Sequence, residues 1–135
     1  MTLIVDSSAI VAITVDEPEA PVFRQLLKAS PRTLISAGTM VELYRLVQTR
    51  FDISQWPDLE RMLELYRVQI APLEPLHLMF AKEGMARFGQ GRGAPPAVLN
   101  FGDLFAYALA RSLNAPLLFK GEDFSQTDVN AAWRP

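Results

Sequence analysis

The sequence predicts an α/β domain built around a mainly parallel sheet. Short runs of apolar and β-branched residues alternate along the chain with segments that carry apolar residues at helical spacing. Parallel strands need long crossovers, and the segments between the candidate strands have helical patterns. The chain has 135 residues, 50% of them hydrophobic, which suffices to bury one core, and no repeat or linker divides it. We therefore expect a single domain over residues 1–135.

The first part of the chain supplies two candidate strands with helical segments after each. The first strand, "TLIV" at residues 2–5, ends at Asp6 in "DSSA", where a serine can cap the next helix. A helix is predicted over residues 21–29, because its apolar residues have helical spacing and a proline is tolerated in the first turn. The second strand candidate is "RTLISA", at residues 32–37.

Two helices and a third strand are predicted next. Residues 38–51 place a set of apolar and aromatic side chains on one helical face, and the pattern repeats over residues 56–68 after a break. The third strand is expected in "VQIAPL", at residues 68–73. The shared face of the first of these helices consists of Met40, Leu43, Tyr44 and Val47.

The last part of the chain adds two helices and a fourth strand. A helix over residues 75–89 leads into the loop "GQGRGAPPAV", whose glycines and prolines break regular structure. The helix that contains "LNFGDLFAYALA" ends near Asn114, and "PLLF" at residues 116–119 is the fourth strand. The remaining tail is rich in turn residues, with a short edge strand expected near residues 129–132.

Composition excludes several classes of protein. The absence of cysteine rules out disulfides, thiolate metal sites and a cysteine nucleophile, and it is compatible with the reducing cytoplasm in which we expect the protein. The single histidine, His77, lies among helix-like apolar residues, where a packing role is expected. No apolar run approaches the roughly 18 to 20 residues of a membrane span, and the N-terminus lacks the basic region of a signal peptide. A net charge of −2 means that a polyanionic substrate would need a local basic strip or bound cations.

Acidic residues follow two predicted strands and stand at the entrances of two predicted helices. Asp6 comes directly after the first strand, and Glu122 and Asp123 closely follow the fourth. Glu42 follows the second strand by about one helical turn, and Asp103 stands near a helix start in an otherwise apolar run. Because ligands bind beyond the carboxyl ends of parallel strands, these acids are expected to converge there.

Each of these acids also has an ordinary structural explanation. Asn100 can cap the last helix while Asp103 interacts with its dipole. Asp6 can assist a serine cap, and Glu42 can pair with Arg45 one turn later. Asp123 can stabilise the turn at Gly121. Taken together, however, acids in one cleft repel one another and destabilise the fold unless a cation binds. Oxygen ligands alone favour a hard cation, Mg²⁺ or Mn²⁺, and such a site suits hydrolysis of a phosphodiester by a metal-activated water.

The sequence resembles the PIN-domain ribonucleases, and in particular the VapC-type toxins of bacterial toxin–antitoxin pairs. The resemblance runs through "LIVDSSAIVAI", "EPEA", "ISAGTMVEL", "GQGRGAPPAVLNFGDLFAYALA" and "PLLFKGEDFSQTDV". It implies a PIN-like three-layer sandwich with a central, mainly parallel sheet of four to five strands flanked by helices. It also implies an Mg²⁺-dependent endoribonuclease toxin that usually forms homodimers and is neutralised by a small VapB-like antitoxin lying in the active-site groove.

The resemblance further implies a set of site residues. Catalysis and binding of Mg²⁺, or Mn²⁺ in its place, fall to four acids, with Glu42 as a ligand or as the group that orients the attacking water. Asp123 matches the family pattern better than Glu122 does. Ser7 looks like the hydroxyl residue that supports the metal site, and Asn100 like a residue that braces it. The four acids are Asp6, Glu42, Asp103 and Asp123.

Contacts to RNA are the least defined part of the expected site. Relatives often carry a histidine or a further basic residue near Ala94, and this chain has none. Arg87, Arg92 and Lys120 remain as candidate phosphate contacts, with solvated surface charge as the alternative. The loop "GQGRG" follows a helix rather than a strand, which disfavours a nucleotide-binding loop.

Three other functions compete with the nuclease hypothesis. A haloacid-dehalogenase-like phosphatase would need a second aspartate where this chain has Ser8. A receiver-like Mg²⁺-binding domain would use Lys120, but it would place its phosphoacceptor after the third strand, where only "APLEPL" is found. A PIN-fold binding module without catalysis is the third possibility, although all four acids are present.

Overall fold

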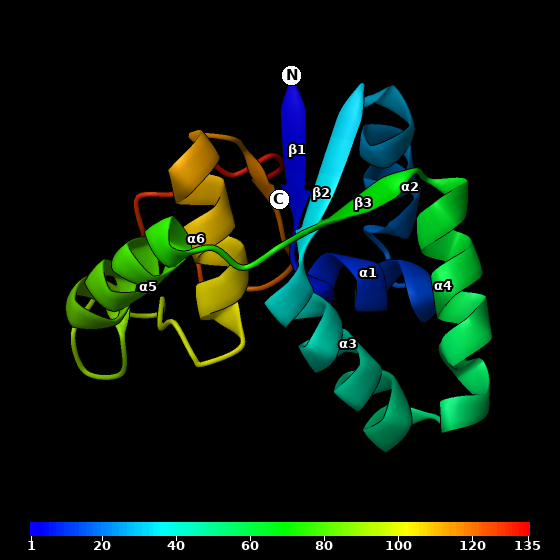
Figure 1. The fold of residues 1–135 in the computed structure, drawn as a ribbon, viewed down its shortest axis with the longest axis horizontal. Helices are drawn as coiled ribbons and strands as arrows, with labels where there is room; N and C mark the ends of the chain where they lie inside the picture. Colours follow the sequence, from blue (N-terminus) through cyan, green and yellow to red (C-terminus); the bar gives the residue numbers. More distant parts are fainter.

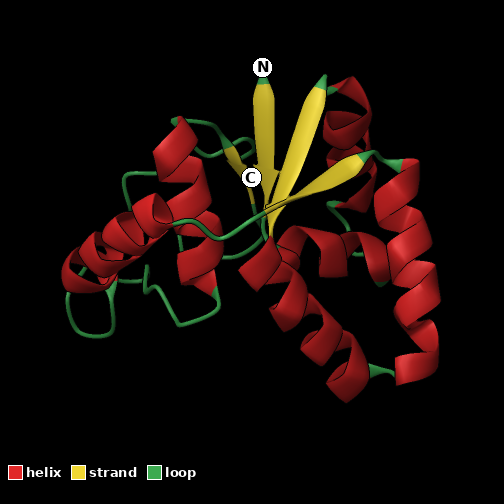
Figure 2. Ribbon diagram, viewed as in Figure 1, coloured by secondary structure: helices red, strands yellow, loops and turns green.

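The structure is a computed structural model that describes all residues from 1 to 135, and it has three layers (Figures 1 and 2). A four-stranded sheet with the order β3-β2-β1-β4 forms the middle layer, and all three strand pairs are parallel. The strands are β1 (Thr2–Val5), β2 (Arg32–Ser36), β3 (Val68–Ala71) and β4 (Leu117–Leu118). The helices are α1 (Ser7–Thr14), α2 (Ala20–Ala29), α3 (Ala37–Arg50), α4 (Trp56–Leu65), α5 (Pro75–Phe88) and α6 (Asp103–Leu113), with a 3₁₀ turn at Ile53–Gln55.

Two hydrophobic cores lie on opposite faces of the sheet. Side chains alternate between the faces of a strand, so Leu3 and Val5 of β1 join one core while Ile4 joins the other. The first core packs against α1, α2, α3 and α4, and the second is built mainly from α6 and β4. Figure 1 shows α5 and α6 on one side of the sheet and α1, α2 and α4 on the other. Burial on both faces explains why β1 and β4 read as continuous apolar runs, whereas β3 at the edge of the sheet is largely exposed.

The expected order of strands and helices is confirmed. On α3, Met40, Leu43 and Val47 are buried as the helical spacing predicted, and Tyr44 packs at the edge of the same core. The expected edge strand near residues 129–132 is reduced to an isolated parallel bridge between Leu117 and Ala131. No helix of the structure combines the length and the apolar character needed to cross a membrane.

Two predicted helix caps are wrong. The N-cap of α1 is Asp6 itself, whose carboxylate accepts the backbone N–H of Ser8, so no serine is needed there. The N-cap of α6 is Gly102, and residues 101–102 form a turn before the helix. Because of that turn, Asn100 lies before the N-cap position. Its backbone carbonyl accepts the N–H of Asp103, the first residue of α6, at 3.0 Å. His77 is buried and forms a capping box with Glu74 at the start of α5, which accounts for it structurally.

Candidate active site

A cavity of about 460 Å³ opens where β1 and β4 end at the carboxyl edge of the sheet. Five acidic side chains line it: Asp6, Glu17, Glu42, Asp103 and Asp123. Its other lining residues include Ser7, Ser8, Leu46, Arg50, Asn100 and Lys120. Distant parts of the sequence thus contribute to one strongly acidic wall.

Asp6 is the most buried of these acids, with 2% of its surface exposed. Its Oδ2 accepts the backbone N–H of Ser8 at 3.0 Å and the Ser8 hydroxyl at 2.7 Å. Its Oδ1 is buried and has no hydrogen-bond partner. Burial, only partly offset by the bonds to Ser8, raises the pKa of Asp6 to about 6. A buried carboxylate oxygen without a partner is costly, so this atom is suited to an additional ligand.

Ser8 links Asp6 to the neighbouring strand end. Its hydroxyl donates to Asp6 and accepts the backbone N–H of Lys120 at 3.0 Å, directly after the segment that carries β4. The hydroxyl therefore holds one carboxylate oxygen of Asp6 and leaves the other free.

Glu42 projects from α3 toward α1 and the start of α6. The Ser7 hydroxyl donates to Glu42 Oε1 at 2.6 Å. The other oxygen lies so close to Gly102 that a β-carbon at that position would overlap the Glu42 carboxylate. Glycine is therefore the residue that leaves room for Glu42 beside the start of α6. The alternative pairing of Glu42 with Arg45 is absent from the structure, in which neither residue forms an ion pair.

Asp103 opens α6 and faces two other acids. Its Oδ2 accepts the backbone N–H of Asn100 at 2.9 Å, and Asn100 Nδ2 donates to Asp123 Oδ2 at 3.4 Å. Burial raises the pKa of Asp103 to about 8, and the negative charges of Asp6 and Asp123 add to the effect. The four sequence-predicted acids, with Ser7 and Asn100, thus lie around one cavity.

The donor set fits a hard divalent cation. The carboxylates supply only oxygen ligands, and the unpaired Oδ1 of Asp6 offers a coordination position. No three of the acidic side chains are placed so that they could hold an ion by themselves. A cation here would therefore complete its coordination shell with water or with substrate oxygens, as Mg²⁺ commonly does.

The sequence-predicted basic residues do not share one location. Lys120 lines the cavity, whereas Arg87 and Arg92 do not. Arg87 pairs with Glu83 at 3.1 Å and Asp128 at 2.9 Å on the surface.

Sequence reasoning missed three polar or charged side chains that line the cavity. These are Ser8, Glu17 and Arg50. Arg50 could have been found, because Glu42, Leu46 and Arg50 recur every four residues on one helix face.

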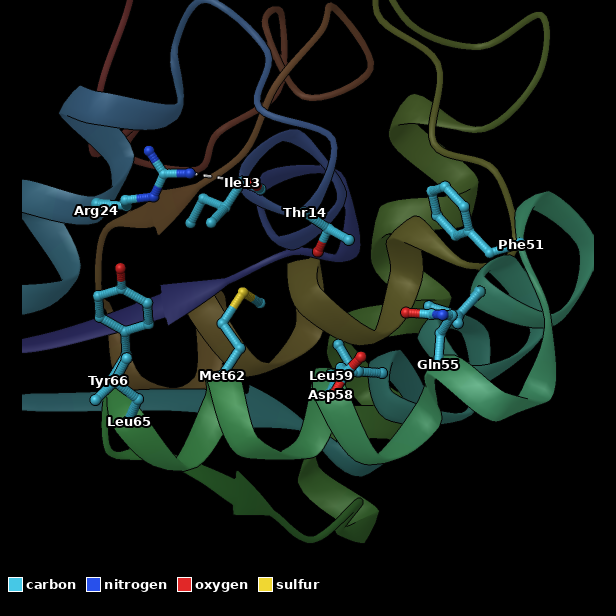
Figure 3. Close-up of a pocket in the computed structure, with 11 residues that line it drawn as sticks. Ile13, Thr14, Arg24, Phe51, Gln55, Asp58, Leu59, Met62, Leu65 and Tyr66 are labelled. Carbon is cyan, nitrogen blue, oxygen red and sulfur yellow. Dashed lines mark hydrogen bonds between the residues drawn. The ribbon is translucent and has the colours of Figure 1, made fainter.

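A second cavity, of about 430 Å³, lies between α1, α3 and α4 and is mainly apolar (Figure 3). Ile13, Phe51, Leu59, Met62 and Leu65 are among its lining residues, and the charged Arg24 and Asp58 also line it. It contains none of the acids of the first cavity.

Comparison with known proteins identifies the family. The model of the PIN domain matches residues 3–130. The chain belongs to the PIN-domain family. It is 40% identical over 132 residues to Ribonuclease VapC42 of Mycobacterium tuberculosis, which covers 96% of this chain and 98% of the relative. Ribonuclease VapC30 of the same organism is 34% identical, covering 94% and 95% of the two chains. Within the PIN-domain family, this protein therefore belongs with the VapC ribonucleases.

Solved structures share the fold. VapC20 of M. tuberculosis, described as a toxin that cleaves the sarcin-ricin loop, gives a TM-score of 0.74 at 16% identity, covering 98% of this chain and 99% of that one. VapBC2 from Rickettsia felis, bound to a DNA fragment from its promoter, gives 0.73 at 18% identity, covering 97% of each chain. The predicted PIN-like sandwich is thus confirmed at the level of the fold.

Proposed function

We propose that the acidic cavity is the active site of a metal-dependent endoribonuclease toxin that acts in the cytoplasm. The observation that carries this proposal is the buried, unpaired Oδ1 of Asp6 in a wall of five acids. A structural cap would satisfy its carboxylate and would not need the other four acids. A site that binds a divalent cation and a phosphodiester needs both features.

Mg²⁺, with Mn²⁺ as a substitute, is the cation that this oxygen-rich site fits best. Asp6, Asp103 and Asp123 would hold it, and Glu42 would be either a further ligand or the group that orients the attacking water. When bound, the cation supplies a water of lowered pKa and stabilises the charge that develops on the phosphate oxygens. The expected products carry a 5′-phosphate and a 3′-hydroxyl.

The chain's own residues position these groups. Ser8 fixes Asp6 through Oδ2, Ser7 holds Glu42 through Oε1, and Asn100 joins Asp103 to Asp123. Each of these bonds restricts a carboxylate without occupying both of its oxygens. Such preorganisation of a charged site is what catalysis of phosphoryl transfer requires.

A VapB-like antitoxin and a second copy of the chain are the proposed protein partners. Support comes from the VapBC complexes among the solved structures of this fold, such as VapBC-1 of nontypeable Haemophilus influenzae. We further propose that the C-terminal segment of the antitoxin lies in the active-site groove and so competes with RNA.

Cleavage of end-labelled total RNA tests the proposal. The purified chain is incubated with Mg²⁺ or Mn²⁺, with EDTA, and as the Asp103→Asn variant in parallel. Discrete cuts that require both the metal and Asp103 support the nuclease. Absence of cleavage by the metal-loaded, antitoxin-free chain would instead favour a PIN-fold binding module without catalysis.

A further inference from the structure

We propose that Arg50 is the side chain that binds an RNA phosphate beside the metal site. This inference rests on the proposed ribonuclease function and names a substrate contact that is not among the three sequence-predicted ones. It follows from the charges around the cavity and from how each cation near it is already paired.

The cavity is strongly negative. Five carboxylates line it, and the only cationic side chains among its lining residues are Arg50 and Lys120. A divalent cation would offset part of the acidic charge, but phosphates next to the scissile one would still meet a negative surface. A polyanionic substrate on a chain of net charge −2 therefore needs a cation of the protein that is free to bind it.

Lys120 is not free. Its Nζ forms an ion pair with Glu17 and another with Glu19, at 3.0 Å for the latter. All three side chains are partly shielded, with 34%, 28% and 17% of their surfaces exposed for Lys120, Glu17 and Glu19. One positive charge shared between two negative ones offers little attraction to a phosphate. Lys120 instead fastens the segment between α1 and α2 to the rim of the cavity.

The other two candidates are also poorly placed. Arg87 is shared between Glu83 and Asp128, so its charge is offset as well. Arg92 lies in the loop between α5 and α6 and does not line the cavity. None of the three sequence-predicted basic residues therefore combines a free charge with a position in the cavity.

Arg50 meets the requirements. It is the last residue of α3, it is exposed, and it forms neither an ion pair nor a hydrogen bond through its side chain in the structure. Glu42 and Leu46 precede it on the same helix face, and both line the cavity. A guanidinium group can donate two parallel hydrogen bonds to a phosphate.

The position of Arg50 also identifies which phosphate it binds. Eight residues separate it from Glu42, which corresponds to about 12 Å along the helix. Arg50 therefore contacts a phosphate further along the strand than the scissile one, and it serves binding rather than the chemical step.

Binding measurements without cleavage test this assignment. A fluorescein-labelled single-stranded RNA of mixed sequence is titrated with the Asp103→Asn protein in Mg²⁺ at several salt concentrations, and anisotropy gives the affinity. Arg50→Gln is added to this background, and Arg45→Gln is the matched control. Arg45 is exposed on the same helix, has no ion pair and does not line the cavity.

Loss of the Arg50 guanidinium is expected to weaken binding roughly tenfold. The slope of log affinity against log salt should fall by about 0.7, the contribution of one contact to a single strand. Arg45→Gln should change neither quantity, and Arg50→Lys should keep the slope because it keeps the charge. Circular dichroism spectra establish that each variant is folded.

Two results would overturn the assignment, and they have different meanings. If the Asp103→Asn protein binds RNA and Arg50→Gln behaves like Arg45→Gln, Arg50 is not a contact while the ribonuclease function stands. If the Asp103→Asn protein does not bind RNA and the wild-type chain does not cleave it, the proposed function fails and the assignment fails with it.

Discussion

The acidic cavity and the apolar cavity of Figure 3 are similar in volume, about 460 and 430 Å³, yet opposite in character. The first collects charged residues from distant segments at the edge of a parallel sheet. The second is enclosed by neighbouring helices and lined mainly by aliphatic and aromatic side chains. A bound cation reduces the electrostatic repulsion between carboxylates. The unfavourable exposure of apolar surface to water is instead removed by contact with another apolar surface. The chemistry of the lining, and not the size of the cavity, is therefore what distinguishes the proposed active site from the second cavity.

The largest difference between the cavities should appear when each loses one carboxylate. Asp103→Asn should reduce RNA cleavage by roughly 10² to 10³-fold, because it removes a charge that stabilises the transition state through the metal. The asparagine still accepts the bond from the Asn100 N–H, so thermal stability in EDTA should stay level or rise. Asp58→Asn in the apolar cavity is the control and should leave cleavage unchanged. If Asp103→Asn unfolds the protein while specific activity persists, Asp103 is only a structural residue.

The next effect concerns stability and pH. The pKa values of Asp6 and Asp103 are raised to about 6 and about 8 in the folded chain, so the folded state binds more protons than the unfolded state above pH 4. The metal-free protein should therefore lose stability as the pH rises from 5 to 8. Asp6 alone contributes about 3 kcal/mol of unfolding free energy over the whole range from below pH 4 to above pH 6, at about 1.4 kcal/mol per pKa unit, and roughly half of this loss falls between pH 5 and 8.

Urea denaturation in EDTA at a series of pH values measures this trend. Mg²⁺ should flatten it, because the cation binds the ionised carboxylates. An unfolding free energy that rises steadily from pH 5 to 8 without metal would contradict the raised pKa values of Asp6 and Asp103 in the folded chain.

A smaller loss of activity is expected from Gly102→Ala. The new β-carbon would displace the Glu42 carboxylate, and cleavage should fall roughly 10- to 100-fold because catalysis is sensitive to misplacement of a group by about 1 Å. Gly93→Ala, whose β-carbon would meet only a mild crowding at 3.3 Å from Phe88 Cα and would not touch Glu42, is the control. Undiminished cleavage by Gly102→Ala would mean that the position of Glu42 is not critical.

Removal of the Ser8 hydroxyl should weaken metal binding while leaving the acids in place. Ser8→Ala leaves Asp6 Oδ2 with the backbone N–H of residue 8 as its only partner and should lower Mn²⁺ affinity roughly tenfold, as the loss of an outer-shell partner does. Titration followed by electron paramagnetic resonance measures the affinity, and Ser8→Thr should restore it. Equal affinity for Ser8→Ala and the wild-type chain would contradict a positioning role.

The smallest effect should come from the apolar cavity. Leu65 is 75% exposed, so Leu65→Ser should change the unfolding free energy by no more than about 0.5 kcal/mol and leave RNA cleavage intact. Parallel denaturation and cleavage assays check both. A fall in cleavage like that of Asp103→Asn would show that the two cavities are not independent.

The order of strands and helices was predictable because it depends on local patterns. Apolar runs and helical spacing identified all four strands and most helix boundaries to within a few residues. The predicted helix start was wrong where a single hydrogen bond decides the boundary. At Gly102, a turn delays the start of α6. The edge strand expected near residues 129–132 proved to be a single bridge, because the pairing of one residue has no sequence pattern of its own.

The sequence by itself determined the alternation of strands and helices and the positions of Asp6, Glu42, Asp103 and Asp123 relative to strand ends and helix starts. These features follow from side-chain periodicity and from the polarity of a parallel sheet, which are local or topological. Only the tertiary structure decided how the charges are paired. In the folded chain Lys120 forms ion pairs with Glu17 and Glu19, whereas Arg50 and Asp6 Oδ1 have no partners. Ion pairs form between residues that the chain brings together from far apart, and no periodicity in the sequence records them.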